Sequence, residues 1–165
     1  MKKKITIIRH GQSVYNTQTH KSQDELKNCR ITELGREQSS KLNHSFDILI
    51  LSPLKRVIET YTNSNIKIED IAICSLFKET YTHFILNKQN DVNFSSINSL
   101  ENESLIIESI EEVKLRATQA RIFIENNKYE NIGIISHKNF IWYFLEACGQ
   151  NPIYLNNTEL ITFEL

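Results

Sequence analysis

Short apolar runs alternate along this chain with longer stretches in which apolar residues recur at helical spacing. The short runs are rich in β-branched residues and are bounded by polar or turn-forming residues, which is typical of strands. The first run is predicted to be a buried strand because it contains three isoleucines in five residues. Five strands are predicted in all, at residues 4–8, 47–51, 71–74, 132–135 and 161–165.

Four helices are predicted between these strands, at residues 32–42, 54–61, 109–126 and about 139–148. Thr32 can cap the first, and Ser52-Pro53 offers a cap residue followed by proline at the first helical position of the second. Gly149 follows the fourth, as is common at helix ends. The third carries an apolar stripe that we expect to pack in the core, made of Ile110, Val113, Ala117, Ala120 and Ile124.

The alternation of strands and helices predicts an α/β fold, a three-layer sandwich with a mostly parallel central sheet flanked by helices. Residues 17–30 and about 87–103 are polar and without periodicity, so we expect loops there. Neither an internal repeat nor a linker interrupts the pattern, and residues 1–165 are predicted to form a single domain. In such sheets ligands bind beyond the carboxyl ends of the strands, so reactive side chains should follow the apolar runs.

Three of the predicted strands are followed by side chains suited to holding a phosphoryl group. Arg9-His10 follows the first, Ser52-Pro53 and then Arg56 follow the second, and Ser136-His137 follows the fourth. If the sheet is parallel, two arginines and two histidines converge at one edge. Arginine offers a flat fork of donors that matches two phosphate oxygens, and a partly neutral imidazole is a natural nucleophile. The pattern therefore predicts a site for phosphoryl transfer.

Charge and cysteine content exclude several other classes. Nineteen Lys+Arg against twenty Asp+Glu give a net charge of -1, which provides no general attraction for nucleic acid or for an anionic membrane. Cys29, Cys74 and Cys148 are widely spaced, which disfavours a disulfide framework or structural zinc and favours a reducing compartment. The apolar run at 5–8 is too short for a signal core or a membrane span. We therefore expect a cytoplasmic protein.

The segment Arg9-His10-Gly11-Gln12-Ser13 with Asn16 resembles the Arg-His-Gly signature of the histidine phosphatase superfamily, which includes phosphoglycerate mutases and many small phosphatases. The resemblance continues in order along nearly the whole chain. It implies a phosphoglycerate mutase-like fold and phosphatase activity. The further matching segments are Thr32–Gln38, Ser52–Arg56 with Thr60, Glu108-Ser109 with Arg116, and Ser136-His137.

The resemblance also implies roles for individual residues. His10 would be the phosphorylated nucleophile, and Asn16 would hold the phosphate or the substrate beyond it. Glu79 matches by position the carboxylic acid that protonates the leaving group. Its neighbours depart from the Gly-containing pattern of the family, so Asp91 or another loop donor remains an alternative. The residues implied to line the phosphate pocket are Arg9, Arg56 and His137.

A metal site at the two histidines is disfavoured, because no carboxylate stands at metal-ligand spacing and two arginines would repel a cation. The expected function is therefore a phosphomonoesterase that needs no metal or other cofactor and acts through a phosphohistidine. Its partner would be a small phosphorylated substrate or a phosphoprotein. Two alternatives stay open: a phosphoglycerate mutase-type phosphotransferase, which the short chain disfavours, and a catalytically weak phosphate-binding protein. The sequence selects neither a substrate nor an oligomeric state.

Overall fold

Five strands form one sheet at the centre of the structure, a computed structural model that describes residues 2–17, 29–82 and 107–165. The strand order is β3-β2-β6-β1-β7; the first four of these run parallel, and β7 is antiparallel to β1. The predicted α/β fold with a mostly parallel sheet is thereby confirmed. The strands are β1 (Lys4–Arg9), β2 (Ser45–Leu51), β3 (Lys67–Ile73), β6 (Asn131–Ser136) and β7 (Leu160–Glu164).

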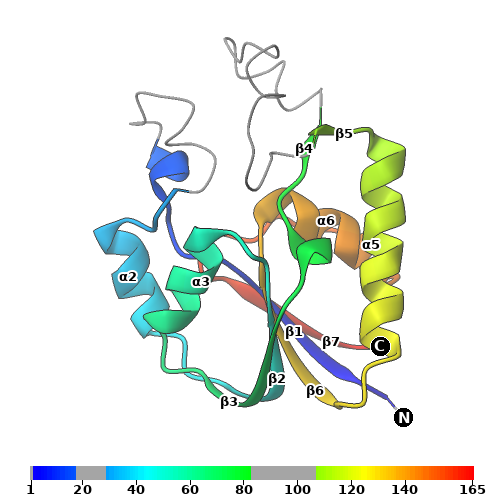
Figure 1. Ribbon diagram of the computed structural model, residues 1–165, viewed down its shortest axis with the longest axis horizontal. Helices are drawn as coiled ribbons and strands as arrows, with labels where there is room; N and C mark the ends of the chain where they lie inside the picture. The colour runs from blue at the N-terminus through cyan, green and yellow to red at the C-terminus, as the bar shows by residue number, and fades with distance from the viewer. Residues whose placement is uncertain (1, 18–28, 83–106) are drawn as a thin grey trace.

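Helices cover both faces of the sheet, with α2 and α3 on one side and α5 and α6 on the other (Figure 1). Successive strand residues point to opposite faces, so the strands feed two buried clusters. Ile5 and Ile7 of β1 belong to the cluster that includes residues of α5 and α6, whereas Ile8 packs with Val57 of α3. The helices are α2 (Glu33–Ser40), α3 (Lys55–Thr62), α5 (Ile110–Glu125) and α6 (Lys138–Ala147).

Several short elements were not predicted, because a segment of two to four residues has no detectable periodicity. They are η1 (Val14–Thr17), η2 (Ser75–Phe77), β4 (Tyr81–Thr82) and β5 (Ile107–Glu108), the last two forming a parallel two-stranded sheet. The loop predicted at about 87–103 and most of the loop predicted at 17–30 lie outside the described residues, as does Asp91.

The carboxyl ends of three neighbouring strands meet at one edge of the sheet. In the register of β1 and β6, Arg9 lies opposite Ser136. The pairing continues one step further, since His10 N donates to Ser136 O at 3.0 Å. On the other side of β6, Ser52 N donates to Ile135 O at 3.2 Å. The residues that follow β1, β2 and β6 are therefore held beside one another by backbone hydrogen bonds.

Three details of the predicted helices are wrong. α3 begins at Lys55 with Leu54 as its N-cap, because Ser52 and Pro53 form the connection from β2. α2 ends at Ser40, two residues before its predicted end. Ile110 is 46% exposed, because it is the first residue of α5 and lies beyond the buried stripe formed by the four other predicted residues.

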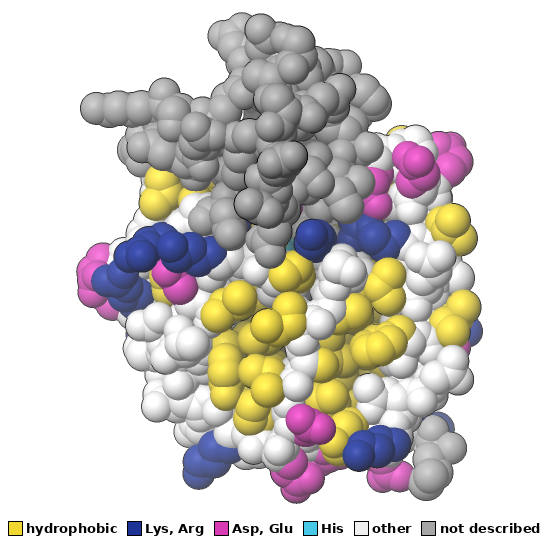
Figure 2. Space-filling view, viewed as in Figure 1, with side chains coloured by type: hydrophobic (Ala, Val, Ile, Leu, Met, Phe, Trp, Pro, Cys, Tyr) yellow, Lys and Arg dark blue, Asp and Glu magenta, His cyan; other side chains and the backbone are white. Residues whose placement is uncertain are grey.

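The edge strand β3 is the most exposed strand of the sheet. Ile71 and Ile73 are 44% and 63% exposed, and Figure 2 shows hydrophobic side chains gathered on the face that carries this strand. An edge strand has a neighbour on one side only, which leaves part of its surface in contact with water. No helix within residues 2–17, 29–82 and 107–165 has the length and apolar character needed to span a membrane.

Candidate active site

His10 follows β1 directly, and its side chain is buried. Its Nδ1 lies 2.7 Å from Gly11 O. A carbonyl oxygen can only accept a hydrogen bond, so Nδ1 carries the ring proton and Nε2 carries the lone pair. Arg56 Nε donates to that Nε2 at 3.3 Å. The local backbone thus fixes the tautomer that leaves a nucleophilic nitrogen facing a guanidinium group.

The pKa of His10 lies well below its ordinary value, and burial is the main cause. The positive charges of Arg56 and Arg9 lower this pKa further, while the hydrogen bond to Gly11 acts in the opposite direction. His10 is therefore neutral at physiological pH, and its Nε2 lone pair is available.

His137 lies at the end of β6, with its ring centroid 5.1 Å from that of His10. Its Nε2 is 2.8 Å from Ser52 Oγ. Within the described parts of the chain, its buried Nδ1 has no hydrogen-bond partner. Burial, followed by the charge of Arg56, lowers the pKa of His137 well below its usual value. A Ser52 hydroxyl that donates to Nε2 leaves the proton of the neutral ring on Nδ1, where it can be donated to an anion.

Two buried arginines complete the positive side of the site. Arg56 stands in the first turn of α3 and is 2% exposed. Arg9 is 9% exposed, and its Nη1 donates to Leu155 O at 2.9 Å. Among the residues that the structure describes, Arg9 Nε has no hydrogen-bond acceptor. Buried donors of this kind are costly unless they are paired, and an oxyanion would satisfy them.

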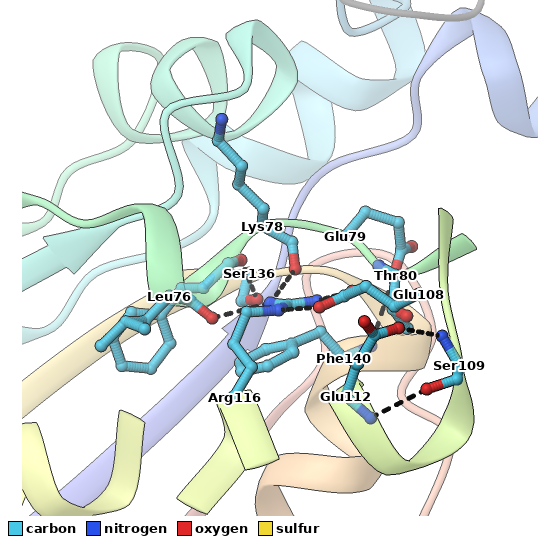
Figure 3. A network of polar contacts seen from close by, with 11 residues as sticks. Leu76, Lys78, Glu79, Thr80, Glu108, Ser109, Glu112, Arg116, Ser136 and Phe140 are labelled. Atoms are coloured by element: carbon cyan, nitrogen blue, oxygen red, sulfur yellow. Dashed lines mark hydrogen bonds and ion pairs between the residues drawn. The ribbon is translucent and has the colours of Figure 1, made fainter. Parts of the chain in front are cut away.

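Glu79 comes shortly after β3 and η2, and Figure 3 shows its side chain beside Thr80 and Phe140. Its Oε1 accepts from Thr80 N at 2.9 Å and from Phe140 N at 3.3 Å. Although the residue is partly exposed, protein atoms surround its carboxyl group, and this burial raises its pKa. The charges of Arg56 and Arg9 oppose the shift, so the carboxyl group interacts with the two arginines of the site.

The sequence profile of the histidine phosphatase superfamily (branch 1) matches residues 5–160. The chain belongs to this superfamily. The resemblance seen in the motifs and the expectation of a phosphatase are thereby confirmed at the level of the superfamily. No curated protein matches the chain significantly.

Solved structures of two phosphatases share the fold. Phosphoserine phosphatase from Entamoeba histolytica, in complex with 3-phosphoglyceric acid, is 21% identical with a TM-score of 0.64, covering 98% of this chain and 90% of that one. A mycobacterial glucosyl-3-phosphoglycerate phosphatase is 14% identical with a TM-score of 0.64, covering 99% of this chain and 91% of that one. At these identities the likeness shows the fold alone.

The loop that carries the Arg-His-Gly signature packs closely against α2, and glycines stand at the points of contact. A Cβ on Gly35 would lie 2.2 Å from Gln12 O, and a Cβ on Gly11 would lie 2.7 Å from Gly35 O. Polar contacts close the same interface, since Thr32 N donates to Gln12 O at 2.8 Å and Gln12 N donates to Gln38 Oε1 at 2.9 Å. The Thr32–Gln38 segment thus holds the loop after β1 in place.

The predicted Asn16 uses its side-chain oxygen within the signature loop. Asn16 Oδ1 accepts from Ser13 N and Ser13 Oγ, both at 3.0 Å, and from Asn157 Nδ2 at 3.3 Å. A direct contact to phosphate would therefore fall to its amide nitrogen. Asn157 was not predicted, although its Nδ2 also donates to His10 O at 2.9 Å. Its only signal in the sequence is its place in a polar turn before the last strand.

The structure brings together the predicted Arg9, His10, Arg56, Glu79 and His137. Ser52 was predicted as a helix cap, and it contacts a histidine instead. Within the described ranges, no group of three or more His, Cys, Asp or Glu side chains is placed to hold a metal ion.

Proposed function

We propose that the protein is a phosphomonoesterase that transfers a phosphoryl group to His10 Nε2 and then to water. The observation that carries this proposal is the state of the His10 ring. Its proton is committed to Gly11 O through Nδ1, and its Nε2 lone pair faces the guanidinium of Arg56. A neutral imidazole held in this tautomer is ready to attack phosphorus without first losing a proton.

In the first step, His10 Nε2 forms a bond to phosphorus as the bond from phosphorus to the ester oxygen breaks. The leaving oxygen takes the proton of the Glu79 carboxyl group and departs as an alcohol. Arg9, Arg56 and the Nδ1–H of His137 stabilise the charge on the transferring oxygens. The raised pKa of Glu79 favours the protonated form that this step requires.

In the second step, the Glu79 carboxylate takes a proton from a water molecule. The resulting nucleophile attacks phosphorus, the bond to His10 Nε2 breaks, and inorganic phosphate is released. The same carboxyl group thus serves as acid and then as base, and it ends the cycle protonated. Two guanidinium groups provide the positive charge that a metal ion supplies in other phosphatases, so the proposed reaction needs no cofactor.

Replacing His10 tests the nucleophile. We expect His10→Ala to abolish hydrolysis of p-nitrophenyl phosphate and to prevent labelling of the protein by a radioactive phosphomonoester. In the wild type the label should be lost in acid and retained in base, which distinguishes phosphohistidine from phosphoserine. His44→Ala is the matched control, because His44 stacks on Phe46 with ring centroids 6.1 Å apart and is not part of the site. Wild-type turnover by His10→Ala would refute the proposal.

The substrate is proposed only as a class, namely a small phosphomonoester or a phosphoprotein side chain. Phosphoserine and 3-phosphoglycerate belong in the first panel, because the names of structural neighbours contain them. The readout is inorganic phosphate, measured with and without EDTA. Loss of activity with EDTA that added metal restores would contradict the metal-free mechanism. Isomerisation of a phosphoglycerate faster than phosphate release would instead favour a mutase.

A further inference from the structure

A buried ion pair lies next to the segment that carries Glu79 (Figure 3). Arg116 of α5 binds Glu108 through two parallel hydrogen bonds, Nε to Oε1 at 2.6 Å and Nη2 to Oε2 at 2.5 Å. The two side chains are only 11% and 7% exposed. Removing both charges from water is expensive, so such a pair is weak evidence for stability by itself. The remaining contacts of Arg116 decide what the pair does.

The remaining guanidinium nitrogen of Arg116, Nη1, binds the backbone just before Glu79. Nη1 donates to Leu76 O at 2.8 Å and to Lys78 O at 2.9 Å. The carbonyl between them, Phe77 O, accepts from Ser136 Oγ at 2.8 Å. Three consecutive carbonyl groups are thus bound by side chains from α5 and β6. Leu76 and Phe77 belong to the short helix η2, and these side chains tie that helix and the residue after it to α5 and β6.

Arg116 also contacts the residue whose backbone holds the carboxyl group. Its guanidinium carbon lies 4.4 Å from the centroid of the Phe140 ring. Phe140 N in turn donates to Glu79 Oε1 at 3.3 Å. The backbone before the acid, and the hydrogen bond from Phe140 N to its carboxylate, therefore lead to the same guanidinium group; the other hydrogen bond to the carboxylate comes from Thr80 N.

Glu108 is itself held in place by the start of α5. The next residue, Ser109, caps the helix: its Oγ accepts from Glu112 N at 3.2 Å, and Glu112 Oε2 accepts from Ser109 N at 2.7 Å. This reciprocal capping fixes the end of the helix. The counterion of Arg116 is therefore anchored by the start of α5, and it also lies in β5, where it is opposite Thr82 of β4, three residues after the acid.

We propose that Arg116 is a positioning residue that holds the Glu79 carboxyl group against the leaving-group oxygen. This inference rests on the proposed role of Glu79. A planar fork suits this position, because Arg116 makes two parallel hydrogen bonds to the carboxylate and one to each carbonyl group, whereas a lysine ammonium has only three donors, all on one nitrogen. A displacement of about 1 Å in a reacting group can cost about a hundredfold in rate.

The test compares two substrates in Arg116→Lys. p-Nitrophenolate leaves readily without a proton, whereas the alkoxide of glycerol 2-phosphate needs one. We expect kcat/KM for glycerol 2-phosphate to fall about 10- to 100-fold, and that for p-nitrophenyl phosphate to change much less. Looser packing should also return the pKa of Glu79 toward its ordinary value. The alkaline limb of the glycerol 2-phosphate profile would then move to lower pH, because a general acid acts only while protonated.

Arg121→Lys is the matched control. Arg121 stands on the same helix, pairs with Glu125 at 2.9 Å and donates to Ala147 O at 3.1 Å, away from the acid. Arg121→Lys should leave the ratio of the two kcat/KM values, for glycerol 2-phosphate and p-nitrophenyl phosphate, unchanged. Thermal melting of each variant identifies the temperatures at which it is folded. Equal losses on both substrates in folded Arg116→Lys would mean a structural role only and would overturn the proposal.

If Arg116→Lys does not fold, Ser136→Ala gives the same test from a different element. It removes the donor to Phe77 O and should also slow glycerol 2-phosphate selectively. If folded Ser136→Ala leaves the ratio of the kcat/KM values for the two substrates unchanged, this counts against the proposal.

A double-mutant cycle separates this inference from the proposed function. Glu79→Gln should selectively lower kcat/KM for glycerol 2-phosphate, because kcat/KM covers the steps up to phosphorylation of His10 and not the second step, which both substrates share. Adding Arg116→Lys to it should produce no further selective loss in kcat/KM. If Glu79→Gln leaves the ratio unchanged, the assignment of the acid fails and the positioning role fails with it. If Glu79→Gln is selective but the two losses are additive, only the role of Arg116 is overturned.

Discussion

At the scale of single residues, His10 and His137 each commit one ring nitrogen to a fixed protein partner. His10 donates to Gly11 O, and His137 pairs with Ser52 Oγ. The motifs predicted both histidines, because each follows an apolar run. Neither tautomer could be predicted: that of His10 depends on the local backbone conformation that brings Gly11 O to its Nδ1, and the contact of His137 joins residues that are 85 positions apart. For the same reason Ser52 was assigned to the nearer structure, the helix that follows it.

Ser52→Ala tests whether this contact matters for the reaction. In the proposed mechanism the Ser52 hydroxyl donates to His137 Nε2 and keeps the ring proton on Nδ1, so its removal takes away a donor to the transferring phosphoryl group for part of the time. We expect kcat/KM on p-nitrophenyl phosphate to fall about tenfold, the equivalent of about 1.4 kcal/mol. Ser64→Ala removes a hydroxyl group that bonds Tyr61 O near the end of α3, and it should leave the rate unchanged. Equal rates in both variants would contradict this role of Ser52.

At the scale of elements, the buried strands β1 and β6 were predicted to within one residue at each end, whereas β3 begins at Lys67, four residues before its predicted start, because the first part of this exposed edge strand is polar. Apolar β-branched runs identify buried strands such as β1 and β6 directly, because burial on both faces demands apolar residues at every position. Where a helix begins depends on which group the side chain of the candidate cap residue binds. Ser52 binds His137 instead, and α3 therefore begins later than Pro53 suggests. The hydrophobic pattern also did not predict that α2 packs on the signature loop. Gly35 is a signal of such packing, because glycine lowers helix propensity and inside a helix often marks a close contact.

Gly35→Ala tests that packing. The added Cβ would meet the carbonyl oxygen of Gln12, a backbone atom that can move only by displacing the signature loop. We expect the free energy of unfolding to fall by about 1–3 kcal/mol and the rate on p-nitrophenyl phosphate to fall as well, because His10 belongs to the same loop. Glu37→Ala, at an exposed position of the same helix, is the control for changes in helix propensity. Urea unfolding and initial rates provide the two readouts, and a Gly35→Ala variant as stable as wild type would contradict the close contact.

At the scale of the whole molecule, the order of the strands brings the site together. β1 and β6 are separated by more than a hundred residues, yet their pairing places His10 beside Ser136 and His137. The general rule for parallel sheets predicted that this convergence would occur at the carboxyl ends. It did not predict the order β3-β2-β6-β1-β7 or the antiparallel last strand, because those depend on which distant strands pair most favourably. The strand order also buries Arg9, His10, Arg56 and His137, and this has a consequence for stability.

Stability should fall as the pH is lowered from 7.5 to 5.5. His10 and His137 have pKa values well below 6.5 when folded, whereas in the unfolded chain they take up protons near that pH. The unfolded state therefore binds more protons in this range, and each histidine contributes up to about 1.4 kcal/mol of lost stability per pH unit. Glu79 acts with the opposite sign, because its pKa is raised above 4.5 on folding and the folded state therefore holds this proton more tightly than the unfolded state does. Urea unfolding of wild type and of the variant with both His10→Gln and His137→Gln isolates the two histidines, with His44→Gln as the control. Equal pH dependence in wild type and in the double variant would show that the buried rings are protonated as easily as free ones.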